Sequence, residues 1–156
     1  MKHNPRASSA VLIFLAAALM VLSTALTSQG QTGAARIDGF IKHTGYEFTH
    51  PAPGGWGIKR PSGLVIIAIT DDDVIIGMVV AQKAKFALTA ESAGEMLRLA
   101  DRLDYIKVGL DDDGDLFVRA EIKFETMTQA DFDDVLKRVI KGADDATAKI
   151  RPYLIK

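Results

Sequence analysis

The sequence contains no cysteine among its 156 residues. This absence excludes disulfide bonds, zinc sites built from thiolates, a cysteine nucleophile and a lipid-modified N-terminal cysteine. The chain also lacks an excess of charge of one sign, since 19 Lys and Arg are balanced by 20 Asp and Glu for a net charge of −1. Because contacts to phosphates need a basic surface, we do not expect nucleic acid as the main partner.

Recognisable catalytic motifs are missing as well. The sequence has no GxSxG, HExxH, GxGxxG or phosphate-binding glycine loop. Beyond the first 28 residues it has two histidines, His43 and His50, which fall in different predicted elements. Paired carboxylates occur only in predicted turns, where solvent keeps them ionised and unsuited to general acid catalysis. We therefore predict a protein that is not an enzyme, with no catalytic residue, no cofactor and no metal site.

Residues 1–28 have the pattern of a signal peptide. Three basic residues, Lys2, His3 and Arg6, precede an apolar run from Val11 to Leu22, and small residues spaced for cleavage follow the run. A membrane-spanning helix needs roughly 20 apolar residues, so cleavage is favoured, and retention as a membrane anchor is the alternative. Either outcome predicts export of a single domain, residues 29–156, to the periplasm or the exterior. Removal of Lys2 and Arg6 leaves 17 basic and 20 acidic residues.

The first part of the predicted domain is rich in strand patterns. Ile37, Phe40 and Ile41 fall on one face of a short helix that Gly45 ends, and Tyr46 to His50 alternates like a strand. The prolines and glycines from His50 to Gly57 indicate a loop. Three further strands are predicted at Trp56 to Arg60, Leu64 to Thr70 and Val74 to Gln82. Trp56 either faces a ligand or packs over the sheet, and packing is favoured.

The hairpin formed by the last two of these strands is apolar on both faces, with a turn at Asp71 to Asp73. Each face therefore needs a cover. Helices of the same chain cover both faces in one interpretation, and a partner or a second subunit covers one of them in the other. The predicted partner surface consists of Val65, Ile67, Ile69, Ile75 and Val79.

The second part of the domain reads as helix, hairpin and helix. Thr89 is placed to cap a helix that ends near Leu103. Strands from Ile106 to Leu110 and from Leu116 to Phe124 alternate between apolar and polar residues and flank the turn residue Gly114. Thr128 opens a long amphipathic helix, with Asp131 positioned for a capping box. Gly142 is expected to bend this helix.

The aspartate-rich turn from Asp111 to Asp115 does not have the spacing of an EF-hand. With Gly114 at loop position 6, the first and last ligand positions fall on Gly109 and Ala120. A weak cation site built from this turn together with Asp71 to Asp73 is the alternative to two solvated turns. It belongs to a second functional hypothesis, a small ligand- or cation-binding domain with unrecognised enzymatic activity that uses His50 or Trp56.

The order of elements resembles a known family. The segments AGEMLRLADRLDYIKVGLDDDGDLFVRAEI and MTQADFDDVLKRVIKGADD resemble the YbjN-like bacterial sensory transduction regulators, which share the fold of type III secretion chaperones. Ala100-Asp101 stands where the family pattern has Ala-Asn. The resemblance implies an α+β domain with an antiparallel five-stranded sheet in the order α-βββ-α-ββ-α, often dimeric, with no catalytic residues.

Together these patterns predict an exported, non-enzymatic binding or regulatory protein of the YbjN-like type. We expect it to act through contacts with a protein partner or with itself as a homodimer, in a chaperone-like or sensory-regulatory role. Contact with a membrane is expected only if the leader is retained. Secretion chaperones are cytoplasmic, so the leader departs from their pattern.

Overall fold

The computed structural model describes residues 33–155, and the predicted leader lies outside this range. The chain divides into two compact units, Met1–Gly39 and Phe40–Lys156. A helix over residues 33–44 runs across the division, and Gly45 ends it with a φ of 76°. Among the described residues, no helix is both long and apolar enough to cross a bilayer.

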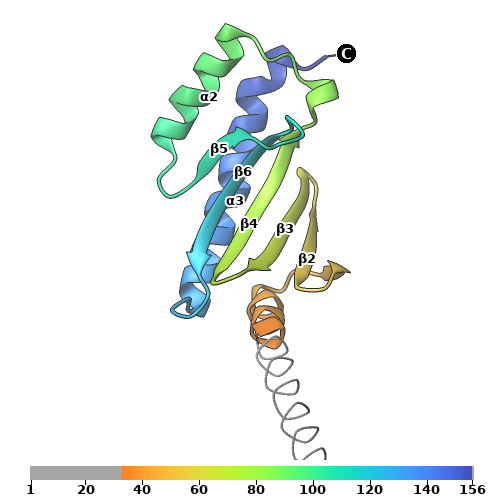
Figure 1. The fold of residues 1–156 in the computed structure, drawn as a ribbon, viewed down its shortest axis with the longest axis vertical. Coiled ribbons are helices and arrows are strands. Elements are labelled where there is room, and N and C mark those ends of the chain that lie inside the picture. Colours follow the sequence, from red (N-terminus) through yellow and green to blue (C-terminus); the bar gives the residue numbers. More distant parts are fainter. Residues whose placement is uncertain (1–32, 156) are drawn as a thin grey trace, which may run out of the picture. The chain divides into compact units, whose positions relative to one another are not determined.

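The second unit is an α+β fold around one antiparallel sheet (Figure 1). The strands are β1 (Phe48–Ala52), β2 (Gly55–Arg60), β3 (Gly63–Thr70), β4 (Asp73–Ala81), β5 (Lys107–Leu110) and β6 (Leu116–Lys123). Their order across the sheet is β1-β2-β3-β4-β6-β5. The helices of this part are α2 (Ala90–Arg102) and α3 (Gln129–Ile150), and short 3₁₀ turns span Lys83–Lys85 and Arg151–Tyr153.

The sheet has six strands, so the predicted five-stranded order was wrong. The additional strand is β1. It overlaps the alternating pattern at Tyr46 to His50 and continues past Pro51 to Ala52. The predicted loop is reduced to a two-residue turn at Pro53 and Gly54, where Gly54 has a φ of 68°. Pro51 is tolerated because β1 is an edge strand with an irregular register, so its missing N–H breaks no central ladder.

The helix-hairpin-helix reading of the second part is confirmed. The Thr89 side chain accepts from the backbone N–H of Ser92 at the start of α2, and Thr128 and Asp131 form a reciprocal capping box at the start of α3. Strands β5 and β6 pair antiparallel, and Gly114 takes the positive φ of 85° that the turn needs. The C-terminal segment returns to the sheet end, where Phe86 and Leu154 form an isolated bridge.

Helix α3 supplies the side chains that cover the centre of the sheet. Its buried residues are Phe132, Leu136, Val139, Gly142, Ala143, Ala146 and Ile150. Gly142 lies inside one continuous helix, at its contact with the sheet: a Cβ there would lie 3.2 Å from Val118 Cγ1 and 3.4 Å from Leu103 Cδ1. The glycine therefore allows the close approach of α3 to β6. The bend expected at Gly142 stays a prediction.

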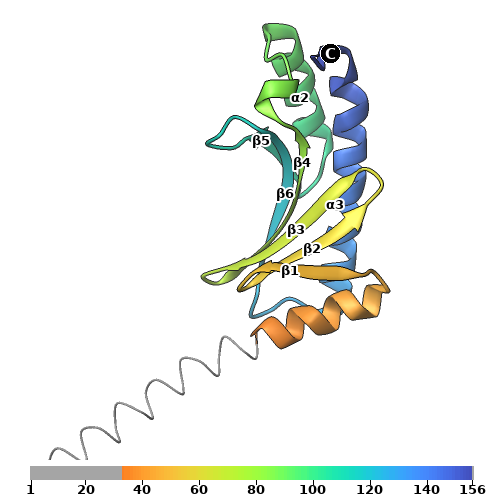
Figure 2. The same ribbon diagram turned by 90° about the vertical axis from the view of Figure 1, so that its right-hand side faces the viewer.

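The two faces of the sheet differ in their cover. Figures 1 and 2 show α2 and α3 on the same side of the sheet, and α3 packs on β4 and β6. Side chains alternate along each strand, so Val65 and Ile67 point to the helix side and are fully buried, whereas Leu64 and Ile66 point away from it. We call the side without α2 and α3 the open face.

This difference between neighbouring residues of β3 gives a direct test of the fold. Ile67→Asp should unfold the domain, because an unpaired charge in a fully buried site costs several kcal/mol, a large part of a typical stability of about 5–15 kcal/mol. Ile66→Asp should leave the fold intact, because the Ile66 side chain is 44% exposed. Circular dichroism during urea denaturation measures both. Equal stability of the two variants would contradict the assignment of the faces.

Candidate protein-binding face

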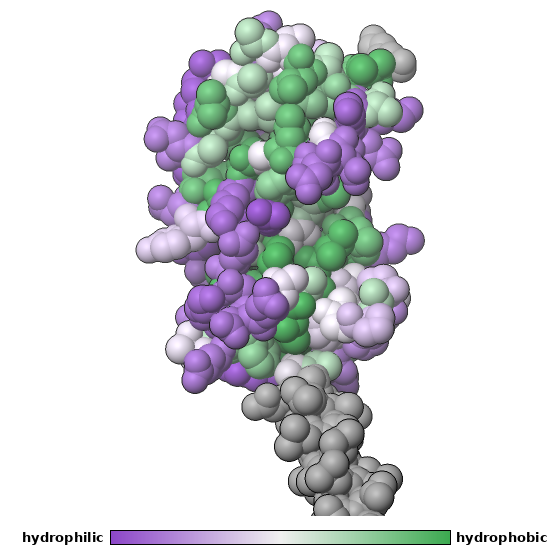
Figure 3. All heavy atoms as spheres, in the orientation of Figure 1, coloured by the Kyte–Doolittle hydropathy of each residue, from purple (hydrophilic) through white to green (hydrophobic). Residues whose placement is uncertain are grey.

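The open face carries a cluster of apolar side chains at its centre. Three of them are large and strongly exposed: Leu64 at 46%, Ile66 at 44% and Val79 at 41%. Ala68, Ile75 and Phe117 are partly buried beside them, and cross-strand pairing places all six on the same side of the sheet. In Figure 3, which views this face, hydrophobic side chains lie over the strands between groups of polar ones. We call these six residues the open-face cluster.

The predicted partner surface divides between the two sides of the sheet. Ile75 and Val79 belong to the open-face cluster. Val65 and Ile67 lie on the helix side with no exposed area, and Ile69 shares their side and is partly buried. The residues that replace them on the open face are Leu64, Ile66 and Ala68, the alternate positions of the same strand.

A shallow groove lies in the middle of the open-face cluster, and its volume is about 170 Å³. It exists because β4 has a glycine, Gly77, between Ile75 and Val79. A Cβ at Gly77 would lie 3.1 Å from Arg119 Cβ and 3.2 Å from the Val118 carbonyl oxygen, so a larger residue would crowd β6. We call this hollow the Gly77 groove; it is lined by Ile66, Ala68, Ile75, Gly77, Met78, Val79, Asp111, Phe117, Val118 and Arg119.

Ion pairs border the groove on the β5–β6 side. Lys107 Nζ lies 2.6 Å from Glu121 Oε2, and Arg119 Nε lies 3.3 Å from Glu121 Oε1. The Arg119 guanidinium also lies 4.7 Å from the centre of the Phe117 ring, a cation–π distance. The hydrogen bond from Lys107 lowers the pKa of Glu121, which keeps this carboxylate ionised between two cations.

A third ion pair lies at the β3–β4 turn. Lys123 Nζ is 3.0 Å from Asp73 Oδ1, and the hydrogen bond from Lys123 to Asp73 raises the pKa of the lysine. All three pairs are solvated and contribute little to stability. Their consequence is instead to place a charged border around an apolar centre, the arrangement found in protein–protein interfaces.

The two aspartate-rich turns do not meet, so the cation site that would combine them is not formed. Asp73 pairs with Lys123 at one end of β6, and Asp115 precedes Leu116 at the other end. The eight residues of β6 make seven steps of about 3.3 Å, which separate these ends by roughly 23 Å. Asp111 Oδ1 accepts from the Asp115 N–H, so its carboxylate stabilises its own turn. Within residues 33–155, no three histidine or acidic side chains are grouped to hold a metal ion.

The aromatic candidates of the ligand-binding hypothesis form a packed group. Trp56 is fully buried, which confirms the interpretation that it packs over the sheet. The ring centre of His50 lies 5.8 Å from that of Trp56 and 5.4 Å from that of Phe48. His50 thus extends the aromatic packing at the edge of the sheet formed by β1 and β2.

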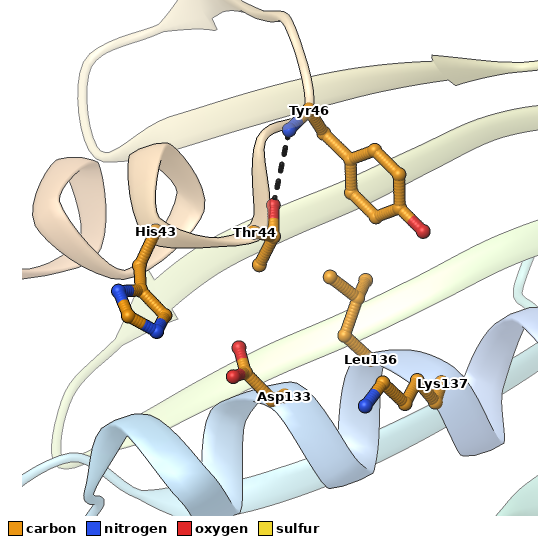
Figure 4. A pocket seen from close by; sticks show the side chains of 6 residues that line it. All are labelled: His43, Thr44, Tyr46, Asp133, Leu136 and Lys137. Atoms are coloured by element: carbon orange, nitrogen blue, oxygen red, sulfur yellow. Dashed lines mark hydrogen bonds between the residues drawn. The ribbon is translucent and has the colours of Figure 1, made fainter.

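A polar pocket of about 250 Å³ lies between the end of the first helix and α3 (Figure 4). It is lined by His43, Thr44, Tyr46, Asp133, Leu136 and Lys137. Several of these groups are engaged locally: Thr44 donates to the Ile41 carbonyl and accepts from the Tyr46 N–H, and Asp133 accepts from Gln129. The pocket is smaller than typical ligand cavities of about 300–1,000 Å³, and Leu136 is the one aliphatic side chain in its lining. The open face is the stronger candidate because it has the contiguous apolar side chains of an interaction site.

The sequence pattern did not indicate which face of β3 would stay open. Its one usable signal lies in β6, where the apolar residues alternate with Phe117, Arg119 and Glu121. The charged residues Arg119 and Glu121 mark the solvent side of β6. Extending that side to β3 requires two registers: that of β6 on β4, in which Arg119 pairs with Gly77, and that of β4 on β3, in which Gly77 pairs with Ile66. Neither register can be deduced from the residues of one strand alone.

Comparison with known proteins identifies the fold. No family model matches the sequence, and no curated protein does. A chain of the heterodimeric ExoU–SpcU complex from the Pseudomonas aeruginosa type III secretion system is similar in structure, with a TM-score of 0.61 and 14% identity over 74% of this chain and 98% of that chain. YbjN of E. coli is similar with a TM-score of 0.61 and 14% identity, over 79% of this chain and 96% of that chain.

The type III secretion chaperone SycH of Yersinia pestis, solved in complex with a fragment of YscM2, is a third similar structure. Its TM-score is 0.55 at 16% identity, over 73% of this chain and 98% of that chain. The expected resemblance to YbjN and to type III secretion chaperones is therefore confirmed at the level of the fold.

The ion pairs of the open face give a testable dependence on pH. Because the pKa of Glu121 is lowered in the folded protein, the Lys107–Glu121 pair stabilises the fold above the ordinary carboxyl pKa of 4.5, and its contribution is lost as the pH falls through the folded pKa. Lys107→Ala should raise the pKa of Glu121 towards 4.5. Carboxyl chemical shifts in an NMR titration measure this change, and an unchanged midpoint would exclude Lys107 as its cause.

Proposed function

We propose that this chain is an exported, non-enzymatic protein that binds a segment of a protein partner on the open face, in a chaperone-like or regulatory role. The observation that carries the proposal is the apolar, uncovered side of the sheet around Ile66 and Val79. A folded domain gains nothing by itself from leaving such side chains in water, since burial of apolar area stabilises by about 25 cal/mol per Å². A contiguous apolar patch with a polar border is typical of an interaction site.

The similar structures support a protein as the partner. SycH was solved with a fragment of another protein bound, and the ExoU–SpcU and HopA1–SchA structures are complexes of two different proteins, the latter described as a chaperone–effector complex. The same class of partner is proposed for this chain, with a second copy of the chain as the alternative occupant.

A non-enzymatic role agrees with the chemistry of the described residues. The open-face cluster offers aliphatic and aromatic groups, and its border offers ion pairs in which each charge already has a partner. Neither set contains a nucleophile placed beside a base. Binding, rather than transformation of a ligand, is what this arrangement can achieve.

Peptide selection tests the binding face. A phage-displayed random peptide library selected on the full chain should yield peptides that lose binding when Ile66 is replaced by Asp, because the charge would be buried by the partner. Leu97→Asp is the matched control: Leu97 lies on α2 and is 73% exposed, so the same chemical change is made away from the open face. Selected peptides that bind both variants as well as the original chain would contradict the proposal.

The N-terminal residue of the mature protein tests export. Mass spectrometry of the protein recovered from a bacterial periplasm or culture medium should show a chain that begins near residue 29. A full-length chain in the membrane fraction would favour the anchor. A full-length chain in the soluble cytoplasmic fraction would remove the exported part of the proposal.

A further inference from the structure

We infer that the polar pocket between the end of the first helix and α3 binds a free α-amino acid with a small side chain, whose ammonium group meets Asp133 and whose carboxylate meets Lys137. All six lining residues of this pocket belong to the second unit, and none of them lines the Gly77 groove. The inference therefore goes beyond the proposed function and does not depend on it. Two observations carry it: opposite charges that face the pocket without pairing, and the size of the pocket.

The opposite charges lie one turn apart on α3. Asp133 and Lys137 have the (i, i+4) spacing at which an acidic and a basic side chain pair on a helix. Two other pairs at this spacing on α3 do form: Asp134 with Arg138, and Lys141 with Asp145. Asp133 instead accepts a hydrogen bond from Gln129 Nε2 at 2.8 Å. Within residues 33–155, Lys137 pairs with no carboxylate.

Both of these side chains line the pocket and project into the same space (Figure 4). A molecule with one positive and one negative group can bind both of them at once. Hydrogen bonds between charged groups are roughly twice as strong as those between neutral groups. An α-amino acid carries its ammonium and carboxylate groups on one carbon atom, so it can reach two side chains whose Cβ atoms are about 5–6 Å apart. The split pair thus matches a zwitterion.

The charges beside the pocket do not favour an ion of either sign. The charged residues adjacent to the lining, in sequence or against the Tyr46 ring, are Lys42, Glu47, Arg60, Asp134 and Arg138. Asp134 and Arg138 neutralise each other, which leaves two basic residues and one acidic residue. The last turn of the first helix ends at the pocket, and the partial negative charge of a helix C-terminus offsets part of this excess. A ligand without net charge therefore suits the pocket better than an anion or a cation.

The size of the pocket limits the side chain of the ligand. A cavity of about 150 Å³ holds benzene, so by the same ratio the 250 Å³ of this pocket has room for about ten non-hydrogen atoms. Glycine, alanine and valine are all within this limit. The Tyr46 ring and Leu136 form the apolar part of the lining, and Leu136 points toward that ring. This apolar part provides the contact for a small aliphatic side chain.

Analogues that lack one charge test the inference on the full chain by isothermal titration calorimetry. The probe is L-valine; isovalerate lacks its ammonium group, and isobutylamine lacks its carboxylate. L-valine should bind at least about tenfold more tightly than either analogue, because each analogue loses one charge-assisted hydrogen bond. Equal affinity of L-valine and either analogue would overturn the inference. Absence of binding for glycine, L-alanine and L-valine at millimolar concentration would overturn it as well.

Variants of the two charged residues locate the effect. Asp133→Asn removes the charge but keeps an oxygen that accepts from Gln129, and Lys137→Met removes the ammonium group but keeps the apolar stem. Each should weaken the binding of L-valine at least about tenfold. Asp134→Asn and Arg138→Met make the same changes in the neighbouring ion pair of α3 and should leave the affinity unchanged. Full affinity in Asp133→Asn or Lys137→Met, with the fold checked by circular dichroism, would contradict the assignment.

NMR of the original chain provides a test that needs no variant. L-valine should shift the imidazole signals of His43, which lines the pocket, and leave those of His50 unchanged, because His50 packs against Trp56 at the edge of the sheet. Binding without a shift at His43 would place the ligand elsewhere and overturn the inference. Ile66→Asp should leave the binding of L-valine unchanged even where it abolishes peptide binding, so the pocket and the open face are tested separately.

Discussion

The structure depends on the pairing of β4 with β6. These strands lie on either side of α2 in the sequence, so their ladder joins the four-stranded first part of the sheet to the hairpin of the second part. The same ladder sets the platform on which α3 packs, because α3 contacts both strands. Gly142 on the helix and the alternation of β6 let the two layers approach closely. Every assignment of a side chain to the helix side or the open face follows from this register.

The open face exists because the two helices α2 and α3 cover the same side of the six-stranded sheet. Helices α2 and α3 both lie on one side, and α2 buries only Ser92 and Leu99 of its own residues. The strands β3 and β4 nevertheless have aliphatic residues on both sides. This imbalance between a two-sided apolar hairpin and one-sided cover is the physical basis of the proposed binding function.

Glycines shape this surface as much as the aliphatic residues do. On the open face Gly57 and Gly77 flank Ile66 in one cross-strand row, and Gly109 pairs with Phe117. Glycine in a strand costs stability because it contributes no side chain to packing. At Gly77 the missing side chain avoids a close contact with β6 and leaves the groove. The same position thus serves the fold and the proposed recognition.

The sequence by itself determined the elements that depend on neighbouring residues. Thr89 and Thr128 marked the helix starts, Gly114 the hairpin turn, and the spacing of Phe132, Leu136 and Val139 the buried side of α3, because caps, turns and helical faces are local. The prolines from His50 onward indicated a loop where β1 continues to Ala52, because tolerance of Pro51 depends on its position in an edge strand. The tertiary structure alone decided that Ile67 is core and Ile66 is surface. Both lie in one uninterrupted apolar run, and only the side on which helices pack distinguishes them.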